Sequence, residues 1–483
     1  MRQRIFLLFT LFFLTFGITT SCSLGTQTSN VQVSPLVSSP LTTQPRDDDD
    51  KASTLRIWWA QGLIPEENAV ITKLVSDWEK TSGIDADISL MQDINIKGEV
   101  EKALTQGNPP DILLTFTGDY NLYPRLAWDG QLADVSAVLE PIKNAYVPAA
   151  LESVRYRNNV AKNRSYYGVP IGQQELHVIF WRDLIEEANL TVEDIPKEWE
   201  GFWAVWKQAQ DNLRAKGKKD IYGLGMTVSD IGTDNFWQFE HILEAFNVKI
   251  VNEQGDLIID SPQAKQGIVN TLRLLSDIQK KGYNPPEAIR WGDPTNNFGF
   301  LSRQVIMTQN PTVSIPLSQK LPNNIYNKNS RDRYFNKIVT TQFPNKPDGT
   351  PMVYLASIRQ VVMFAASKNQ EAGQKFLNYL VKPENLDIFL KEANKGRIFP
   401  VLKDQLNEPF WNDPEDPHLS AAAVQYRQPS RLLPLVNNPA YSQVPAQQVW
   451  GKALLRIIRD NISPELAAAE AIAEIKAIFT AWK

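Results

Sequence analysis

Near the start of the chain, segments whose apolar residues have the spacing of a strand alternate with a segment whose apolar residues have the spacing of a helix. This alternation limits the folds that the chain can adopt. Residues 55–59 form a short apolar, aromatic run, and residues 86–91 alternate apolar with polar side chains, as strands do. Between them, apolar residues from Ile71 to Trp78 recur at the spacing of one helix face. Residues 112–116 are then uniformly apolar, which is typical of a strand buried on both faces of a parallel sheet. The order predicts an α/β fold with layered strands and helices.

The same order of elements continues downstream without an internal repeat. We predict a strand at 176–181, a helix at 184–189, a helix at 262–281 and a C-terminal helix that begins after Ser463. A chain of 483 residues is long enough for two or three domains. Since no linker separates two halves, we expect domains that exchange the chain more than once.

The N-terminus has the pattern of an export signal. Arg2 and Arg4 precede an apolar run at 5–16 and a short exit of small residues that ends at Cys22. This pattern predicts a signal peptide at 1–21, because the apolar run is too short for a permanent membrane span. The exit also resembles a bacterial lipobox, which implies a lipid on Cys22. An ordinary signal peptide cut nearby is the alternative, and residues 22–53 read as a flexible tether.

Composition excludes several classes of protein. The formal charge is −4 and the isoelectric point is near 5.7, which argues against a nucleic-acid partner. One cysteine forbids an internal disulfide, and His177, His241 and His418 lack the spacing of metal ligands, so we predict no metal and no cofactor. The 13 tryptophans are the feature that needs an explanation.

Several motifs occur in an order that resembles the extracellular solute-binding proteins of ATP-binding-cassette importers. The resemblance is to the carbohydrate-binding family that includes maltose-binding protein. Each motif alone is weak, and their common order is the stronger signal. They lie at residues 111–116, 167–170, 178–184, 196–202, 291–293, 300–307, 367–372, 376–380 and 399–401.

The resemblance implies two α/β lobes with a sugar or polyol bound in the cleft between them. It places one lobe at 54–172 plus 348–395 and the other at 173–347 plus 396–483. Lobe closure would present the ligand to permease subunits in a bacterial membrane, with the protein a monomer held on the exported side by its lipid. The family's returning loop carries a glycine pair that is absent around residues 354–359 here, which implies a narrower cleft or one reached by Arg359.

A neutral polyol needs flat apolar platforms together with side chains that both donate and accept hydrogen bonds. Candidates therefore follow the predicted strand ends and loops, where ligands bind in α/β sheets. For each of them, core packing, helix capping or a solvated loop is the competing interpretation. The predicted ligand-binding residues are Trp58, Trp59, Gln61, Thr117, Asp119, Gln174, Glu175, Trp237, Glu240, Trp291, Asp293, Asn310, Tyr354, Arg359 and Arg397.

Three other functions compete with sugar binding. A glycoside hydrolase needs two facing carboxylates, which Asp119, Glu175, Glu240 and Asp293 could supply, but no catalytic motif accompanies them, so we predict no enzyme activity. The same scaffold could bind a polyamine or glycerol phosphate. A structural or adhesion lipoprotein is the third alternative, and it predicts no small-molecule binding.

Overall fold

The computed structural model describes residues 54–321, 324 and 327–482. The predicted signal peptide, Cys22 and the tether lie outside the described residues. Within these ranges no helix is long and apolar enough to cross a membrane.

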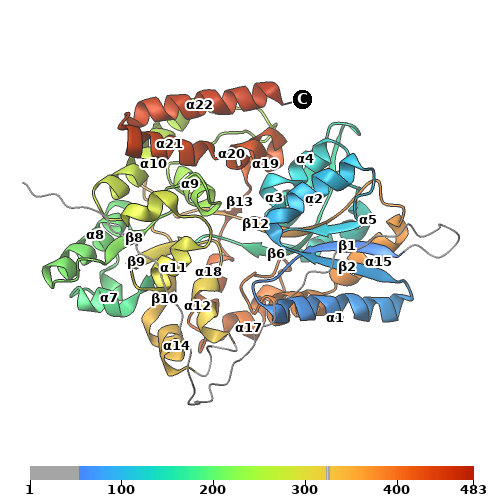
Figure 1. The fold of residues 1–483 in the computed structure, drawn as a ribbon, viewed down its shortest axis with the longest axis horizontal. Coiled ribbons are helices and arrows are strands. Elements are labelled where there is room, and N and C mark those ends of the chain that lie inside the picture. The colour runs from blue at the N-terminus through green and yellow to red at the C-terminus, as the bar shows by residue number, and fades with distance from the viewer. Residues whose placement is uncertain (1–53, 322–323, 325–326, 483) are drawn as a thin grey trace, which may run out of the picture. The chain divides into compact units, whose positions relative to one another are not determined.

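The first sheet has the strand order β2-β1-β3-β12-β6. Figure 1 labels β1, β2, β12 and β6 of this sheet. Strand β1 pairs in parallel with β2 and β3, whereas β12 runs antiparallel to both β3 and β6. The predicted strands near 55, 86 and 112 are confirmed. The strands are β1 (Leu55–Ala60), β2 (Ala86–Met91), β3 (Ile112–Leu114), β6 (Val169–Gln174) and β12 (Ser357–Met363).

Helix α1 (Pro65–Ser82) shows why the sequence pattern was informative. Proline opens the helix, where its missing N–H costs nothing, and Gly83 ends it with a left-handed φ of 70°. Its buried side chains include Ile71 and Trp78, as the helical spacing predicts. The other helices beside this sheet are α2 (Asp93–Thr105), α3 (Gly118–Asn121), α4 (Tyr123–Trp128), α5 (Ser136–Leu139), α6 (Pro148–Ser153), α15 (Gln370–Leu380) and α16 (Pro383–Asp387).

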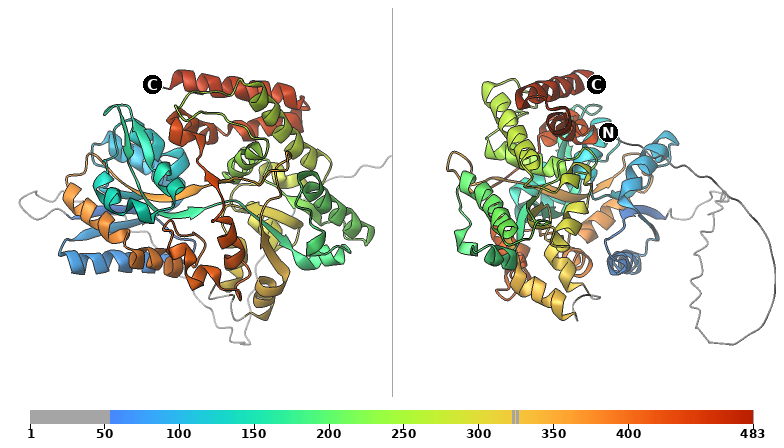
Figure 2. Two further views of the ribbon diagram at one scale, coloured as in Figure 1. Left: turned by 180° about the vertical axis from the view of Figure 1, so that it is seen from behind. Right: turned by 60° about the vertical axis from the view of Figure 1, so that its left-hand side comes forward.

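The second sheet has the strand order β10-β7-β9-β8. Its strands are β7 (His177–Trp181), β8 (Tyr222–Gly225), β9 (Val305–Asn310) and β10 (Ile338–Thr341). Around it lie α7 (Arg182–Glu187), α8 (Trp199–Ala215), α9 (Asp234–Ala245), α10 (Pro262–Lys280), α11 (Thr295–Leu301), α12 (Ser314–Leu317), α14 (Lys328–Asp332), α19 (Pro434–Asn437), α20 (Gln443–Ala446), α21 (Val449–Asp460) and α22 (Pro464–Ala481). Ser463 caps α22 as predicted, since its Oγ accepts a hydrogen bond from the Leu466 N–H at 3.1 Å. Helices α21 and α22 lie side by side in both views of Figure 2.

The chain passes between the two sheets more than once. Residues 175–176 join β6 to β7, and residues 342–356 lead from β10 to β12. This second passage contains β11 (Tyr354–Leu355), which pairs in parallel with β13 (Ser430–Arg431). The return toward β13 carries α17 (Pro409–Asn412) and α18 (Leu419–Gln425), and a hairpin of β4 (Arg155–Asn158) and β5 (Asn163–Tyr166) adjoins the first sheet.

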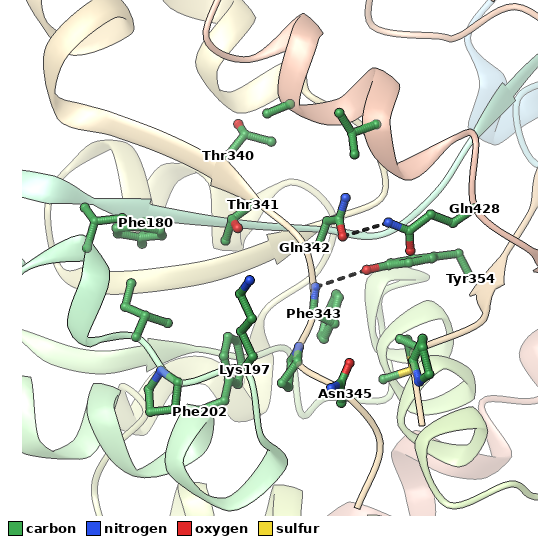
Figure 3. A pocket seen from close by; sticks show the side chains of 18 residues that line it. Phe180, Lys197, Phe202, Thr340, Thr341, Gln342, Phe343, Asn345, Tyr354 and Gln428 are labelled. Atoms are coloured by element: carbon green, nitrogen blue, oxygen red, sulfur yellow. Dashed lines mark hydrogen bonds between the residues drawn. The ribbon is translucent and has the colours of Figure 1, made fainter. Parts of the chain in front are cut away.

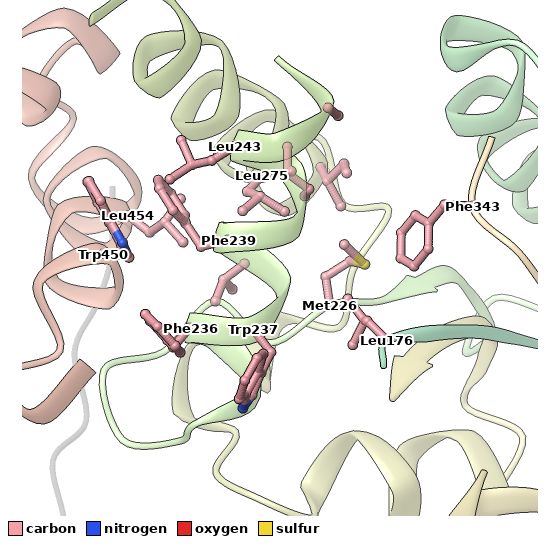
Figure 4. Packing of buried hydrophobic residues seen from close by; sticks show 14 of the residues in the cluster. Leu176, Met226, Phe236, Trp237, Phe239, Leu243, Leu275, Phe343, Trp450 and Leu454 are labelled. Carbon is pink, nitrogen blue, oxygen red and sulfur yellow. The ribbon is translucent and has the colours of Figure 1, made fainter. Parts of the chain in front are cut away.

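Each sheet has its own hydrophobic core. The second core stacks Phe239 on Trp450 at 4.5 Å and continues through α9 and α10 (Figure 4). The first core surrounds β1, β3, β6 and β12 and also contains side chains between Ile398 and Tyr426. Packing shows which side chains touch and not which segments move together, so the predicted lobe boundaries stay a prediction.

Candidate functional site

Polar side chains gather at one edge of the first sheet. Strands β1, β3 and β6 end at this edge, and the antiparallel β12 begins there. The register pairs Ser357 with Gln174 and Arg359 with Gly172. Because Asp119 follows β3 at the same edge, the fold brings three predicted site residues together.

These side chains form one hydrogen-bonded network. Ser357 Oγ donates to Asp119 Oδ2 at 2.7 Å, and Gln174 Nε2 donates to Ser357 Oγ at 3.3 Å. Arg359 Nη2 donates to Gln174 Oε1 at 3.0 Å, and its guanidinium lies 4.9 Å from the centre of the Phe116 ring. The network fixes an acid, an amide and a cation beside one aromatic face.

The network leaves hydrogen-bonding capacity unused. Asp119 Oδ1 and the Nε and Nη1 atoms of Arg359 are buried and have no hydrogen-bond partner among the described residues. Burial raises the pKa of Asp119 to about 6, against the opposing effects of Arg359 and Ser357. Since buried polar atoms are nearly always paired in proteins, unpaired donors and an unpaired acceptor within one network suit a ligand hydroxyl.

Two other predicted residues at this edge are engaged locally. Thr117 Oγ1 donates to Asp93 Oδ2 at 3.2 Å, and Gln61 Nε2 donates to the Leu90 carbonyl at 3.3 Å. Gln61 also lines a hollow of about 660 Å³ between the end of β2 and α2. Gln61 therefore lies at solvent-accessible space, and Thr117 is half-buried.

Arg397 forms a buried ion pair with Glu67 on α1, with 2.5 Å between Nη2 and Oε2. Burial raises the pKa of Glu67 despite this partner. A guanidinium with a buried carboxylate beside it has less capacity left for a ligand than Arg359 has. Its predicted ligand contact stays a prediction.

The adjacent residues Trp58 and Trp59 point in opposite directions, as neighbouring strand residues do. Trp59 is 2% exposed and packs edge to face on Phe389 at 6.0 Å within the first core. Trp58 is half-buried. Of the two rings, Trp58 is the one with surface to offer a ligand.

The second sheet contributes an edge of its own, where the predicted loop residues are held by protein partners. Asp293 accepts hydrogen bonds from the backbone N–H groups of Thr233 and Asp234 at 2.8 and 2.9 Å, at the start of α9. Trp291 is 3% exposed and belongs to the second core, and Asn310 Nδ2 donates to the Thr312 carbonyl at 2.7 Å. These contacts favour a packing or capping role, and ligand contact by these residues stays a prediction.

Three further predicted residues are buried in the second core. Trp237 is 4% exposed, and Glu240 is fully buried and accepts a hydrogen bond from Trp450 Nε1 at 3.2 Å. Tyr354 is 1% exposed, and its hydroxyl accepts a hydrogen bond from the Phe343 N–H at 3.2 Å. A ligand would have to displace these contacts to reach them.

One contact between the two cores was missed by sequence reasoning. Tyr120 of α3 packs on Phe236 at 6.2 Å and edge to face on Trp237 at 5.5 Å, so a ring beside the first sheet enters the second core. The only sequence feature that could have indicated this contact is that Tyr120 directly follows the predicted site residue Asp119.

The first crossover carries a buried acid. Glu175 Oε2 accepts a hydrogen bond from Gln425 Nε2 at 3.0 Å, and the Glu175 N–H donates to the Tyr426 hydroxyl at 3.0 Å. Burial raises the pKa of Glu175 to about 8 and lowers that of His177, which also contacts Gln425, to about 4. Sequence reasoning missed Gln425 and Tyr426, because they lie some 250 residues from Glu175.

Two sheets, repeated chain crossings and a polar edge at the strand ends define the two-lobed fold of periplasmic binding proteins. The chain belongs to the bacterial extracellular solute-binding protein family, whose model matches residues 73–420. The predicted fold class and family are therefore confirmed. Proteins of this family are binding proteins. The described residues hold no group of three or more histidine, cysteine, aspartate or glutamate residues placed to bind a metal.

Solved structures show the same fold. An ABC transporter solute-binding protein from Thermotoga lettingae TMO, bound with alpha-D-tagatose, is 19% identical; the match covers 88% of this chain and 99% of that one, with a TM-score of 0.68. Maltose-bound MalE3 of T. maritima is 18% identical over 88% and 99% of the two chains, with a TM-score of 0.67. The cyclic alpha-maltosyl-1,6-maltose binding protein from Arthrobacter globiformis is 18% identical over 89% and 99%, also at 0.67. A comparison with curated protein sequences finds no match.

Proposed function

We propose that this protein captures a sugar or polyol between its two lobes and delivers it to the permease of an ABC importer. The observation that carries the proposal is the network at the edge of the first sheet, where Asp119 and Arg359 keep unpaired buried atoms. The sugars bound by the similar structures support the same ligand class. We propose binding without catalysis, and a monomer as the functional unit.

We propose that the lobes separate to admit the ligand. The space beside Asp119 measures about 10 Å³ and is lined by Leu433, Leu435 and Val436 of the second core, whereas Gln174, Ser357 and Arg359 do not line it. A volume of this size is close to that of a single water probe, so this space is too small for a sugar. We propose a hinge that opens for the ligand and is biased toward the closed form once the ligand contacts both lobes.

A thermal-shift screen tests the proposed ligand class. Monosaccharides, disaccharides, trisaccharides and glycosylated osmolytes would each be added to the purified protein, since a ligand that binds the folded state raises its melting temperature by mass action. We expect at least one of them to stabilise the protein without being consumed. Stabilisation by spermidine or glycerol 3-phosphate alone would contradict the proposal, and so would turnover of a sugar.

Glycerol phosphate is the second candidate because two nitrogen atoms of the Arg359 guanidinium, Nε and Nη1, have no hydrogen-bond partner among the described residues. Asp119 lies in the same network and would repel a phosphate whenever it is ionised. The neutral sugar is therefore the better fit to the whole network.

Replacing Arg359 with alanine is expected to lower affinity for the stabilising sugar about 10- to 100-fold, as the loss of a charged hydrogen-bond donor does. Isothermal titration calorimetry would measure the change. Arg331→Ala, an exposed arginine on α14, is the matched control and should leave the affinity unchanged. An affinity of Arg359→Ala within twofold of the original protein would remove Arg359 from the site.

The export and anchoring of the protein are part of the proposal. We expect a lipid on Cys22 to hold the protein at the membrane, and Cys22→Ala to release most of it, because an acyl chain contributes about 0.8 kcal/mol per buried CH₂ group. Partition into a detergent phase would measure this, with Ser23→Ala as the control. An original protein that partitions into water as Cys22→Ala does would contradict lipidation.

A further inference from the structure

A cavity of about 600 Å³ lies beside β10, away from the polar edge of the first sheet (Figure 3). Its walls come from β7, β10, α8, the passage at 342–354 and the region of α18. Among the predicted sugar-site residues that the structure describes, only Tyr354 lines it. The cavity has the volume of an ordinary small-molecule site.

The walls of the cavity are mostly apolar and are held in place by hydrogen bonds. Phe180 and Phe202 project from the second core, and Phe343 and Met352 from the passage between the sheets. The Phe343 N–H donates to the Tyr354 hydroxyl at 3.2 Å, which closes the passage into a loop. A second bond runs from Gln428 Nε2 to Gln342 Oε1 at 2.9 Å and joins the passage to the chain after α18. These two hydrogen bonds hold the passage against the cavity.

The lining of the cavity carries one positive charge and no negative charge. Lys197 is the only residue with a charged side chain among the 18 that line it; it is exposed to solvent, and its side chain points toward Thr341 in Figure 3. The Lys197 ammonium makes no ion pair or hydrogen bond with any of the residues that the structure describes, and no lining residue is acidic. An ammonium with three free donors on the wall of a cavity that aromatic rings also line favours a ligand that carries an anionic head on an apolar body.

We propose that this cavity is a second binding site, for a small organic carboxylate with an aromatic or aliphatic body. Its carboxylate pairs with Lys197 and its body fills the space between Phe180, Phe202 and Phe343. The site shares only Tyr354 with the predicted sugar-binding residues and none of the Asp119, Gln174 and Arg359 network, so the proposal does not rest on sugar binding. Two walls belong to segments that connect the sheets, and an occupant would therefore order residues 342–354.

Calorimetry with phenylacetate and hexanoate tests the site, with 2-phenylethanol as the uncharged match. We expect both carboxylates to bind more tightly than the alcohol. Lys197→Met, which keeps an unbranched apolar side chain and removes the charge, should weaken phenylacetate binding at least about tenfold and leave the alcohol unaffected. Lys219→Met is the control, because Lys219 is exposed and does not line the cavity.

Hydrogen exchange locates the site independently of Lys197. Phenylacetate should slow exchange in residues 342–354, and Val424→Trp, which places a large ring at the cavity wall, should abolish both binding and protection. The proposal is overturned if no carboxylate binds more tightly than the alcohol, if Lys197→Met binds phenylacetate as well as the original protein does, or if protection falls elsewhere.

Discussion

Replacing Trp59 with alanine is expected to lower the free energy of unfolding by about 3–5 kcal/mol, the usual effect of removing a large buried ring. Trp59 is 2% exposed and packs on Phe389, so its loss leaves a cavity inside the first core. Chemical denaturation followed by circular dichroism would measure the change.

Trp58→Ala is the matched control, because Trp58 directly precedes Trp59 on the same strand. This substitution removes the same kind of side chain from a half-buried position. We expect it to cost at most about half as much, in proportion to the smaller apolar area taken from the core. Equal destabilisation by the two substitutions would mean that the two rings do not differ in burial as the structure shows.

The elements of the fold could be predicted because their signals are local. The apolar helix face from Ile71 to Trp78 and the helix-ending glycine, Gly83, lie within one stretch of the chain, and α1 contains this face and ends before this glycine. The polar edge was also predictable, since parallel strands end at the same edge wherever the sheet lies. Asp119 was predicted by that argument, whereas Gln174 was predicted from its place at the inferred first crossover and Arg359 from the resemblance of its segment to the family's returning loop.

The fate of the tryptophans could not be predicted in the same way. Trp291 lies in a loop of polar residues, yet Ser229 donates a hydrogen bond to its backbone carbonyl and the second core covers its ring. The residues that bury Trp237 include Tyr120, which comes from the far side of a chain crossing. A sequence window around either tryptophan contains none of these distant partners, so a buried ring and a ligand platform look alike.

The free energy of unfolding should depend on pH through Glu175. Burial at the first crossover raises the pKa of this carboxyl to about 8, against an ordinary value of 4.5, so at neutral pH the folded protein keeps a proton that the unfolded chain has lost. Between about pH 4.5 and 8, each unit of rising pH therefore favours unfolding by about 1.4 kcal/mol through this group, and outside that window its contribution is constant.

Glu175→Gln should remove this dependence, because glutamine keeps the shape and the acceptor for Gln425 Nε2 without a titrating group. We expect the variant to be more stable than the original protein, with an advantage that grows from near pH 5 to pH 8 and is small below pH 4.5. Urea denaturation at each pH would measure the difference, in which the effect of His177 cancels because both proteins contain it. Glu193→Gln, at an exposed position, controls for the change in net charge. An advantage that is independent of pH would show that Glu175 is ionised in the folded hinge.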